Sequence, residues 1–121
     1  MRNDKSNPIV ELTLEFALEI VRYSELLEEN RKYVIARQLL KSGTSIGANV
    51  REAQNAESKA DFIHKLKIAA KEADETEYRL ILCKKSENYP NPEKLELLLT
   101  SIIKMLSKII STSKQKDNNI K

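Results

Sequence analysis

The residues best suited to chemistry lie between positions 38 and 77, where polar and cationic side chains recur at helical spacing. Small polar or acidic residues return every three or four positions, at Gln38, Ser42, Ser45, Asn49 and Glu52. This spacing places them on one face of a helix. Arg37, Lys41 and Arg51 form a basic edge on the same predicted helix. Arginine and lysine contact nucleic-acid phosphates, and hydroxyl and amide groups add hydrogen bonds. A nucleic-acid backbone is therefore one candidate ligand.

The polar stripe also has a structural interpretation, which we favour. Hydroxyl and amide groups on the flank of a helix can hydrogen-bond across a close helix contact and fix its register. Glu52 would then need a cationic partner on another helix. Three further lysines are weaker candidates for phosphate contact, at Lys65, Lys67 and Lys71. No aromatic residue stands among these cations to stack on bases, so any nucleic-acid binding there should be weakly sequence-specific.

The sequence shows no constellation typical of an enzyme or a metal site. His64 is the single histidine, and with Asp61 it supplies at most half of a di-iron bundle site. Cys83 lies on an apolar register, which is typical of a buried, inert thiol. The run from Gly43 to Gly47 lacks the GxxxxGK[ST] pattern of a phosphate loop. We expect no catalytic residues, no cofactor and no bound metal.

The composition predicts an all-α protein. The 121 residues include two glycines and three prolines, and 32% are charged. Sheets and tight turns require more glycine and proline than this chain contains. A chain of this length suits a single domain. One cysteine excludes an internal disulfide and fits a reducing compartment. Because we find neither a membrane-spanning apolar run nor a signal-peptide segment, we expect a cytoplasmic protein.

Start signals and apolar spacing predict four helices. They span about residues 8–29, 31–56, 58–86 and 91–111, and a flexible polar tail follows at 112–121. Asn7-Pro8 and Asn91-Pro92 each place Asn before Pro at a helix start, and Ser58 is a third cap. The apolar residues of the third and fourth helices alternate at spacings of four and three, as in bundles with shallow crossing angles. Short connections then predict an antiparallel up-down-up-down four-helix bundle, with residues 1–121 as one domain.

The first predicted helix is apolar on two sides. One stripe contains Leu12, Phe16, Ile20, Tyr23 and Leu27. A second stripe, roughly 100° away, contains Val10, Leu14, Ala17, Leu18 and Val21. The third predicted helix has a smaller apolar set opposite its core stripe, at Ile68, Tyr78 and Leu82. A helix that is apolar on two sides is usually covered on two sides, so we predict that the second stripe and this smaller set contact other copies of the chain. The alternative is a wide core stripe with scattered exposed apolar residues.

The run QLLKSGTSIGANVREAQNAESKADFIHKLKIAAKEADETEYRL, residues 38–80, closely resembles the bacterial four-helix-bundle proteins called 23S rRNA intervening-sequence proteins. The resemblance extends more weakly to FALEIV in the first helix and covers roughly Leu12 to Leu106. It departs at Arg79, where many relatives have an aromatic residue.

The resemblance implies a bundle that assembles as a ring, typically a homopentamer. Five copies at +3 each would carry +15, which makes even a mild basic edge electrostatically significant. Family members look like reading frames within rRNA intervening sequences, and a related branch resembles accessory proteins of diversity-generating retroelements. We therefore expect a non-enzymatic homo-oligomer that binds RNA or a ribonucleoprotein through a basic surface. The alternative is an adaptor ring that docks a partner enzyme such as a reverse transcriptase.

Overall fold

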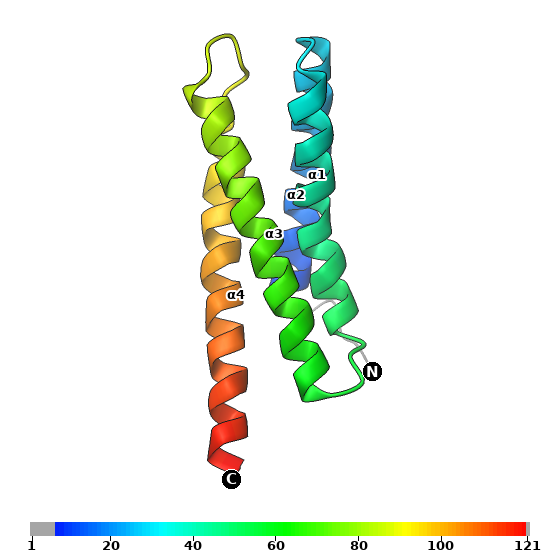
Figure 1. The fold of residues 1–121 in the computed structure, drawn as a ribbon, viewed down its shortest axis with the longest axis vertical. Helices are drawn as coiled ribbons and strands as arrows, with labels where there is room; N and C mark the ends of the chain where they lie inside the picture. Colours follow the sequence, from blue (N-terminus) through cyan, green and yellow to red (C-terminus); the bar gives the residue numbers. More distant parts are fainter. Residues whose placement is uncertain (1–6, 121) are drawn as a thin grey trace.

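The computed structural model describes residues 7–120, which form four long helices joined by short turns (Figure 1). The helices are α1 (Pro8–Glu29), α2 (Tyr33–Ala53), α3 (Lys59–Lys85) and α4 (Glu93–Ile120). Each helix packs against the next along the chain, and α4 packs back against α1. The predicted all-α four-helix bundle is confirmed. No helix in residues 7–120 is long and apolar enough to cross a membrane.

The helix starts follow the signals in the sequence, with one change of role. The Ser58 side chain accepts the backbone N–H of Asp61 at 3.0 Å, as expected of an N-cap. The backbone N–H of Glu93 donates to the Asn91 side chain at 3.0 Å. Asn7 precedes Pro8 but makes no cap hydrogen bond. Its amide instead donates to the side chain of Gln54 at 2.9 Å, which ties the start of α1 to the end of α2.

Both limits of α2 and both limits of α4 differ from the prediction: α2 ends at Ala53, before the predicted residue 56, and α4 begins at Glu93, after the predicted residue 91. α2 begins at Tyr33 because Arg31 has a φ of 63°, a left-handed conformation that separates α2 from α1. α4 continues to Ile120, so residues 112–120 are helical, whereas we predicted that the helix ends near residue 111 and that a polar tail follows; residue 121 lies outside the described residues. No glycine or proline follows Pro92 to end the helix. α2 also runs unbroken through Gly43 and Gly47.

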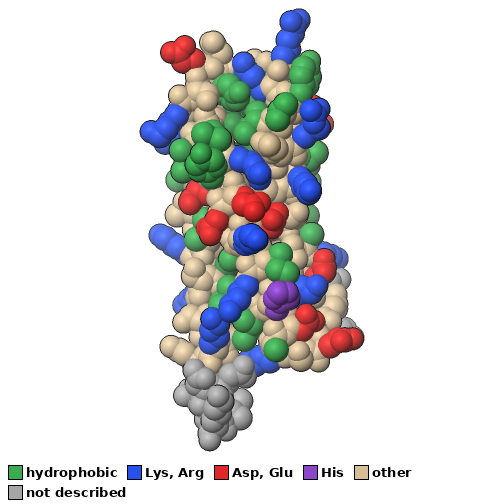
Figure 2. Space-filling model, in the orientation of Figure 1, with side chains coloured by type: hydrophobic (Ala, Val, Ile, Leu, Met, Phe, Trp, Pro, Cys, Tyr) green, Lys and Arg blue, Asp and Glu red, His purple; other side chains and the backbone are tan. Residues whose placement is uncertain are grey.

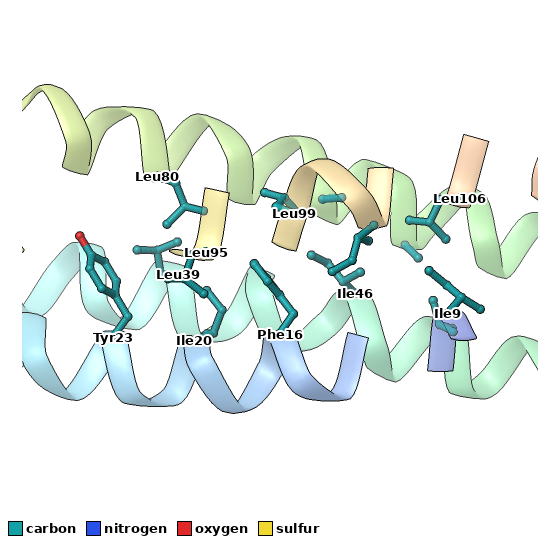
Figure 3. Close-up of a cluster of buried hydrophobic side chains, with 14 of the residues drawn as sticks. Ile9, Phe16, Ile20, Tyr23, Leu39, Ile46, Leu80, Leu95, Leu99 and Leu106 are labelled. Carbon is teal, nitrogen blue, oxygen red and sulfur yellow. The ribbon is translucent and has the colours of Figure 1, made fainter. Parts of the chain in front are cut away.

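The core follows the apolar stripes of the four helices. Figure 3 shows side chains from all four helices meeting at the centre of the bundle. Phe16 and Ile20 of α1 are fully buried, as are Leu39 of α2 and Leu80 of α3. The four-three stripe predicted on α3 faces this core, because its members from Leu66 to Cys83 are all buried. Within residues 7–120, a binding site must therefore be formed by the exposed faces of the helices or by the turns that join them.

Candidate functional site

Two members of the polar stripe of α2, Ser42 and Glu52, contact side chains of α3. The hydroxyl oxygens of Ser42 and Thr76 are 2.9 Å apart and buried, and the Thr76 hydroxyl is 2.8 Å from the carbonyl oxygen of Glu72. Glu52 pairs with Lys65 across the same contact, with Nζ and Oε1 3.1 Å apart. Both contacts connect residues of two helices, so they fix how α2 and α3 are aligned.

The remaining members of the stripe have local roles. Ser45 donates to the carbonyl of Lys41 at 2.7 Å, and Asn49 donates to the carbonyl of Ser45 at 2.9 Å. Gln38 is exposed near the start of α2. Ser42 and Glu52 therefore contact α3, whereas Ser45 and Asn49 bond within α2 and Gln38 faces solvent.

The second apolar stripe of α1 is largely uncovered in the single chain. Leu14, Leu18 and Val21 are 56%, 52% and 38% exposed, and Ala17 is half-buried. Val10 is the exception, because it packs into the core of its own chain. On α3, Tyr78 and Leu82 are also exposed, whereas Ile68 is half-buried. The predicted contact between copies thus has an exposed apolar surface available on α1.

Two shallow grooves between α1 and α2 bring the predicted copy contacts and the predicted phosphate contacts together. One groove, of about 180 Å³, places Arg51 with Leu14 and Ala17. The other, of about 170 Å³, places Arg37 with Val21 and also with two carboxylates of α1. One face cannot both be covered by another copy and remain open to RNA. The two predictions therefore compete for this face.

A second basic cluster lies on the opposite pair of helices, α3 and α4. Lys67 and Lys71 are exposed on α3, and neither makes an ion pair with a described residue. Lys114 of α4 lies beside Lys67, and the side-chain contact with Lys67, together with the charge of Lys67, lowers the pKa of Lys114. Figure 2 shows Lys and Arg side chains gathered beside the histidine on this face, below a group of acidic side chains. We call Lys67, Lys71 and Lys114 the lysine cluster.

Lys114 is the member of this cluster that the sequence reasoning missed. It falls in the segment that we expected to be a flexible tail, where no fixed neighbour would be assigned to it. The signal was the absence of any helix-ending residue after Pro92. Once α4 is extended, Lys114 comes beside Lys67 because α3 and α4 run antiparallel.

Among residues 7–120 the His, Cys, Asp and Glu side chains form no metal-binding cluster, and the single cysteine is buried. Within residues 7–120 no three His, Cys, Asp or Glu side chains are grouped so that they could hold a metal ion. Cys83 is a free cysteine in the core, where burial raises the pKa of its thiol. A buried neutral thiol is a poor nucleophile.

The chain matches one described family and a solved structure. The family model of the 23S rRNA-intervening sequence protein matches residues 5–111. Among solved structures, the chain is similar to a protein of unknown function from the S23 ribosomal protein family of Bacteroides thetaiotaomicron VPI-5482. The two are 48% identical with a TM-score of 0.79, and the match covers 84% of this chain and 97% of that one. No curated protein matches the chain.

Proposed function

This chain belongs to the 23S rRNA-intervening sequence protein family, and on that premise we propose that it is a non-enzymatic homo-oligomer that binds RNA through a basic surface. The observation that carries the proposal is the lysine cluster on α3 and α4. Lys67 and Lys114 come from different helices and lie side by side, and Lys71 is one helical turn along α3 from Lys67. Repulsion between like charges is relieved when an anion binds between them. The repeated phosphates of RNA supply such anions at a spacing that several lysines can share.

The lysine cluster fits RNA better than the basic residues of α2 do. Arg37 and Arg51 line grooves that also contain the exposed apolar residues of α1, so a second copy on that face would cover them. Lys65 is engaged with Glu52. Lys41 remains exposed but stands apart from the cluster. In this arrangement the α1–α2 face serves assembly and the α3–α4 face serves RNA.

Binding of this kind is predominantly electrostatic. Lysine ammonium groups act as point charges on phosphates and read no base sequence, so affinity depends strongly on salt and weakly on sequence. Assembly of several copies would repeat the cluster around the particle, and a long RNA could contact more than one copy. We therefore expect affinity to rise with RNA length.

Two charge-matched triple variants test which surface binds RNA. Lys67→Gln/Lys71→Gln/Lys114→Gln and Arg37→Gln/Lys41→Gln/Arg51→Gln each remove three positive charges. We expect the first to weaken binding of a labelled single-stranded RNA by about tenfold or more at low salt, because it removes the phosphate contacts. The second should stay within about threefold of the unmodified protein, an effect of net charge alone.

Fluorescence anisotropy measures both affinities, and light scattering checks that both variants keep the mass of the unmodified protein. If the α2 variant loses binding and the lysine-cluster variant does not, the RNA surface is on α2. If neither variant differs from the unmodified protein, the RNA proposal is wrong.

The adaptor function is the second candidate, and exposed apolar residues on α3 favour it. Tyr78 is 64% exposed, and Ile81 and Leu82 are 38% and 42% exposed. Contiguous apolar exposure marks protein interaction surfaces more often than nucleic-acid surfaces. The purified oligomer can be treated with nuclease and high salt to remove RNA. If it then retains one protein partner in a fixed ratio, this result would support an adaptor that docks a partner enzyme such as a reverse transcriptase. Loss of that partner in Tyr78→Ser/Leu82→Ser would place the contact.

A further inference from the structure

A pocket with cations, aromatic rings and an amide lies at one end of the bundle. The turn between α1 and α2 and the turn between α3 and α4 both lie at the upper end in Figure 1. They contribute to a pocket of about 410 Å³, which is lined by Arg31, Lys32, Tyr33, Gln38 and Tyr89 together with two aliphatic residues. The lining contains two positive charges and no carboxylate. Its volume is within the roughly 300–1,000 Å³ of small-molecule sites.

The turn that supplies both cations is fixed by its own backbone. Arg31 adopts a φ of 63°, its N–H donates to the carbonyl of Glu28 at 2.9 Å, and the N–H of Lys32 donates to the carbonyl of Leu27 at 2.8 Å. This pair of bonds is the Schellman arrangement that ends helices. It directs the chain out of α1 and into α2 within three residues. The positions of Arg31, Lys32 and Tyr33 relative to α1 are therefore set by backbone hydrogen bonds.

Two contacts join this turn and its helix to the α3–α4 turn. The Nζ atom of Lys32 lies 4.8 Å from the centre of the Tyr89 ring, a cation–π contact. The Tyr23 hydroxyl of α1 donates to the carbonyl of Pro90, next to Tyr89, at 2.6 Å. The ring of Tyr89 thus holds one cation in the pocket, and Tyr23 holds the backbone beside that ring.

The remaining groups are open to a ligand. Tyr33 is 49% exposed and Gln38 is exposed. The side chains of Arg31 and Gln38 make no hydrogen bond or ion pair with another residue of the described chain. The half-exposed ring of Tyr33 offers a stacking surface for a base. The guanidinium of Arg31 can bind a phosphate through two hydrogen bonds, and the amide of Gln38 can both donate to and accept from a base edge. These are the groups that a single nucleotide needs.

We propose that this pocket binds one nucleotide of a single strand, with its base stacked on Tyr33 and its phosphate between Arg31 and Lys32. The inference deepens the proposed RNA binding, on which it rests, by adding a site that contacts a base. A duplex keeps its bases stacked on one another, so it cannot offer a free base to Tyr33. Lys67 is 18 residues from Lys85 at the pocket end of α3, roughly 27 Å at 1.5 Å per residue. A trinucleotide bound in the pocket would therefore not extend to the lysine cluster, whereas a longer strand could contact both.

The test uses labelled trinucleotides of RNA and DNA, a longer single strand, and matched tyrosine variants of the whole chain. Tyr33→Leu removes the ring but keeps apolar bulk, and should weaken binding of the trinucleotide about tenfold, the effect of one lost base stack. Tyr33→Phe keeps the ring and should bind within about twofold of the unmodified protein. Leu97→Gln replaces an exposed apolar residue of α4 that belongs to neither proposed surface, and should leave trinucleotide binding unchanged. Equal affinity for RNA and DNA would assign binding to base and phosphate, and a preference for RNA would add a contact to the 2′-hydroxyl.

The outcomes separate this inference from the function on which it rests. The pocket assignment is wrong if Tyr33→Leu binds the trinucleotide as well as the unmodified protein does. It is also wrong if duplex RNA displaces the labelled trinucleotide as strongly as a single strand does. The lysine-cluster variant should still lose the longer strand in that case, and the proposed function would stand. If neither Tyr33→Leu nor the lysine-cluster variant changes binding of any strand, both proposals fail together.

Discussion

Gly43 is a glycine because Ile20 occupies the space that a β-carbon would need. A Cβ atom at position 43 would lie 2.7 Å from Cγ1 and 2.8 Å from Cδ1 of Ile20. Ile20 is fully buried and β-branched, so it has little freedom to move aside. The sequence places two glycines, Gly43 and Gly47, in a helical segment. It could not show which residue approaches, because that depends on how α1 and α2 pack.

Gly43→Ala should therefore destabilise the protein although alanine favours helix. Overpacking a core costs about 1–3 kcal/mol, which exceeds the roughly 1 kcal/mol gained in helix propensity. Urea unfolding at fixed protein concentration measures the difference. Gly47→Ala is the matched control: its Cβ would meet Thr13 at 3.3 Å, so a small adjustment suffices and a smaller effect is expected. An equal or increased stability of Gly43→Ala would contradict the packing argument.

Tyr23 and Cys83 should make the protein less stable at alkaline pH. Burial raises the pKa of both groups above their ordinary values of 10.0 and 9.0. Below about pH 8 folded and unfolded chains both keep most of these protons. At higher pH the unfolded chain releases them first, so the free energy of unfolding falls, by at most about 1.4 kcal/mol per pH unit for each group. In urea unfolding, Tyr23→Phe should flatten this fall, and Tyr78→Phe, which alters an exposed tyrosine, should not.

At the scale of helices, local signals predicted the elements well where the deciding interaction is short-range. Ser58 bonds to Asp61 three residues away, and the four-three spacing from Leu66 to Cys83 matches the buried face of α3. The start of α2 was less accurate because Arg31 is not a residue type expected in a left-handed conformation. The end of α4 was missed because a polar composition was taken as a sign of fraying. A polar helix without Gly or Pro has nothing local to end it.

The exposed apolar face of α1 should determine assembly. Leu14→Gln/Leu18→Gln replaces two side chains that are 56% and 52% exposed, so folding of the single chain should be little affected. If this face is covered by another copy, the mass measured by light scattering should fall to that of one chain, because burial of the leucines no longer stabilises the contact. Leu97→Gln is the control, since Leu97 is 66% exposed on α4. An unchanged oligomer in the α1 variant would show that this face is not the interface.

At the scale of the whole molecule, the sequence did not indicate which surface is available for assembly and which for nucleic-acid binding. Arg37 and Arg51 were chosen for their charge, and the structure places them in the grooves that also hold Leu14 and Val21. The pocket at the bundle end was not predicted, because Tyr33 and Tyr89 are far apart in the chain and no spacing rule relates them. The cue in the sequence was the triplet Arg31-Lys32-Tyr33, two cations followed by a ring. Only the meeting of two turns makes it a pocket.

Assembly and RNA binding should be coupled in a way that salt reveals. The logarithm of affinity falls with the logarithm of salt concentration, with a slope proportional to the number of phosphates contacted. A single chain offers one lysine cluster, whereas an oligomer offers one for each copy, so a long RNA should bind the oligomer more tightly and with a steeper slope. Leu14→Gln/Leu18→Gln changes no charge. It should therefore reduce the slope for a long RNA and leave the affinity for a trinucleotide unchanged. Equal slopes for the variant and the unmodified protein would mean that each copy binds RNA by itself.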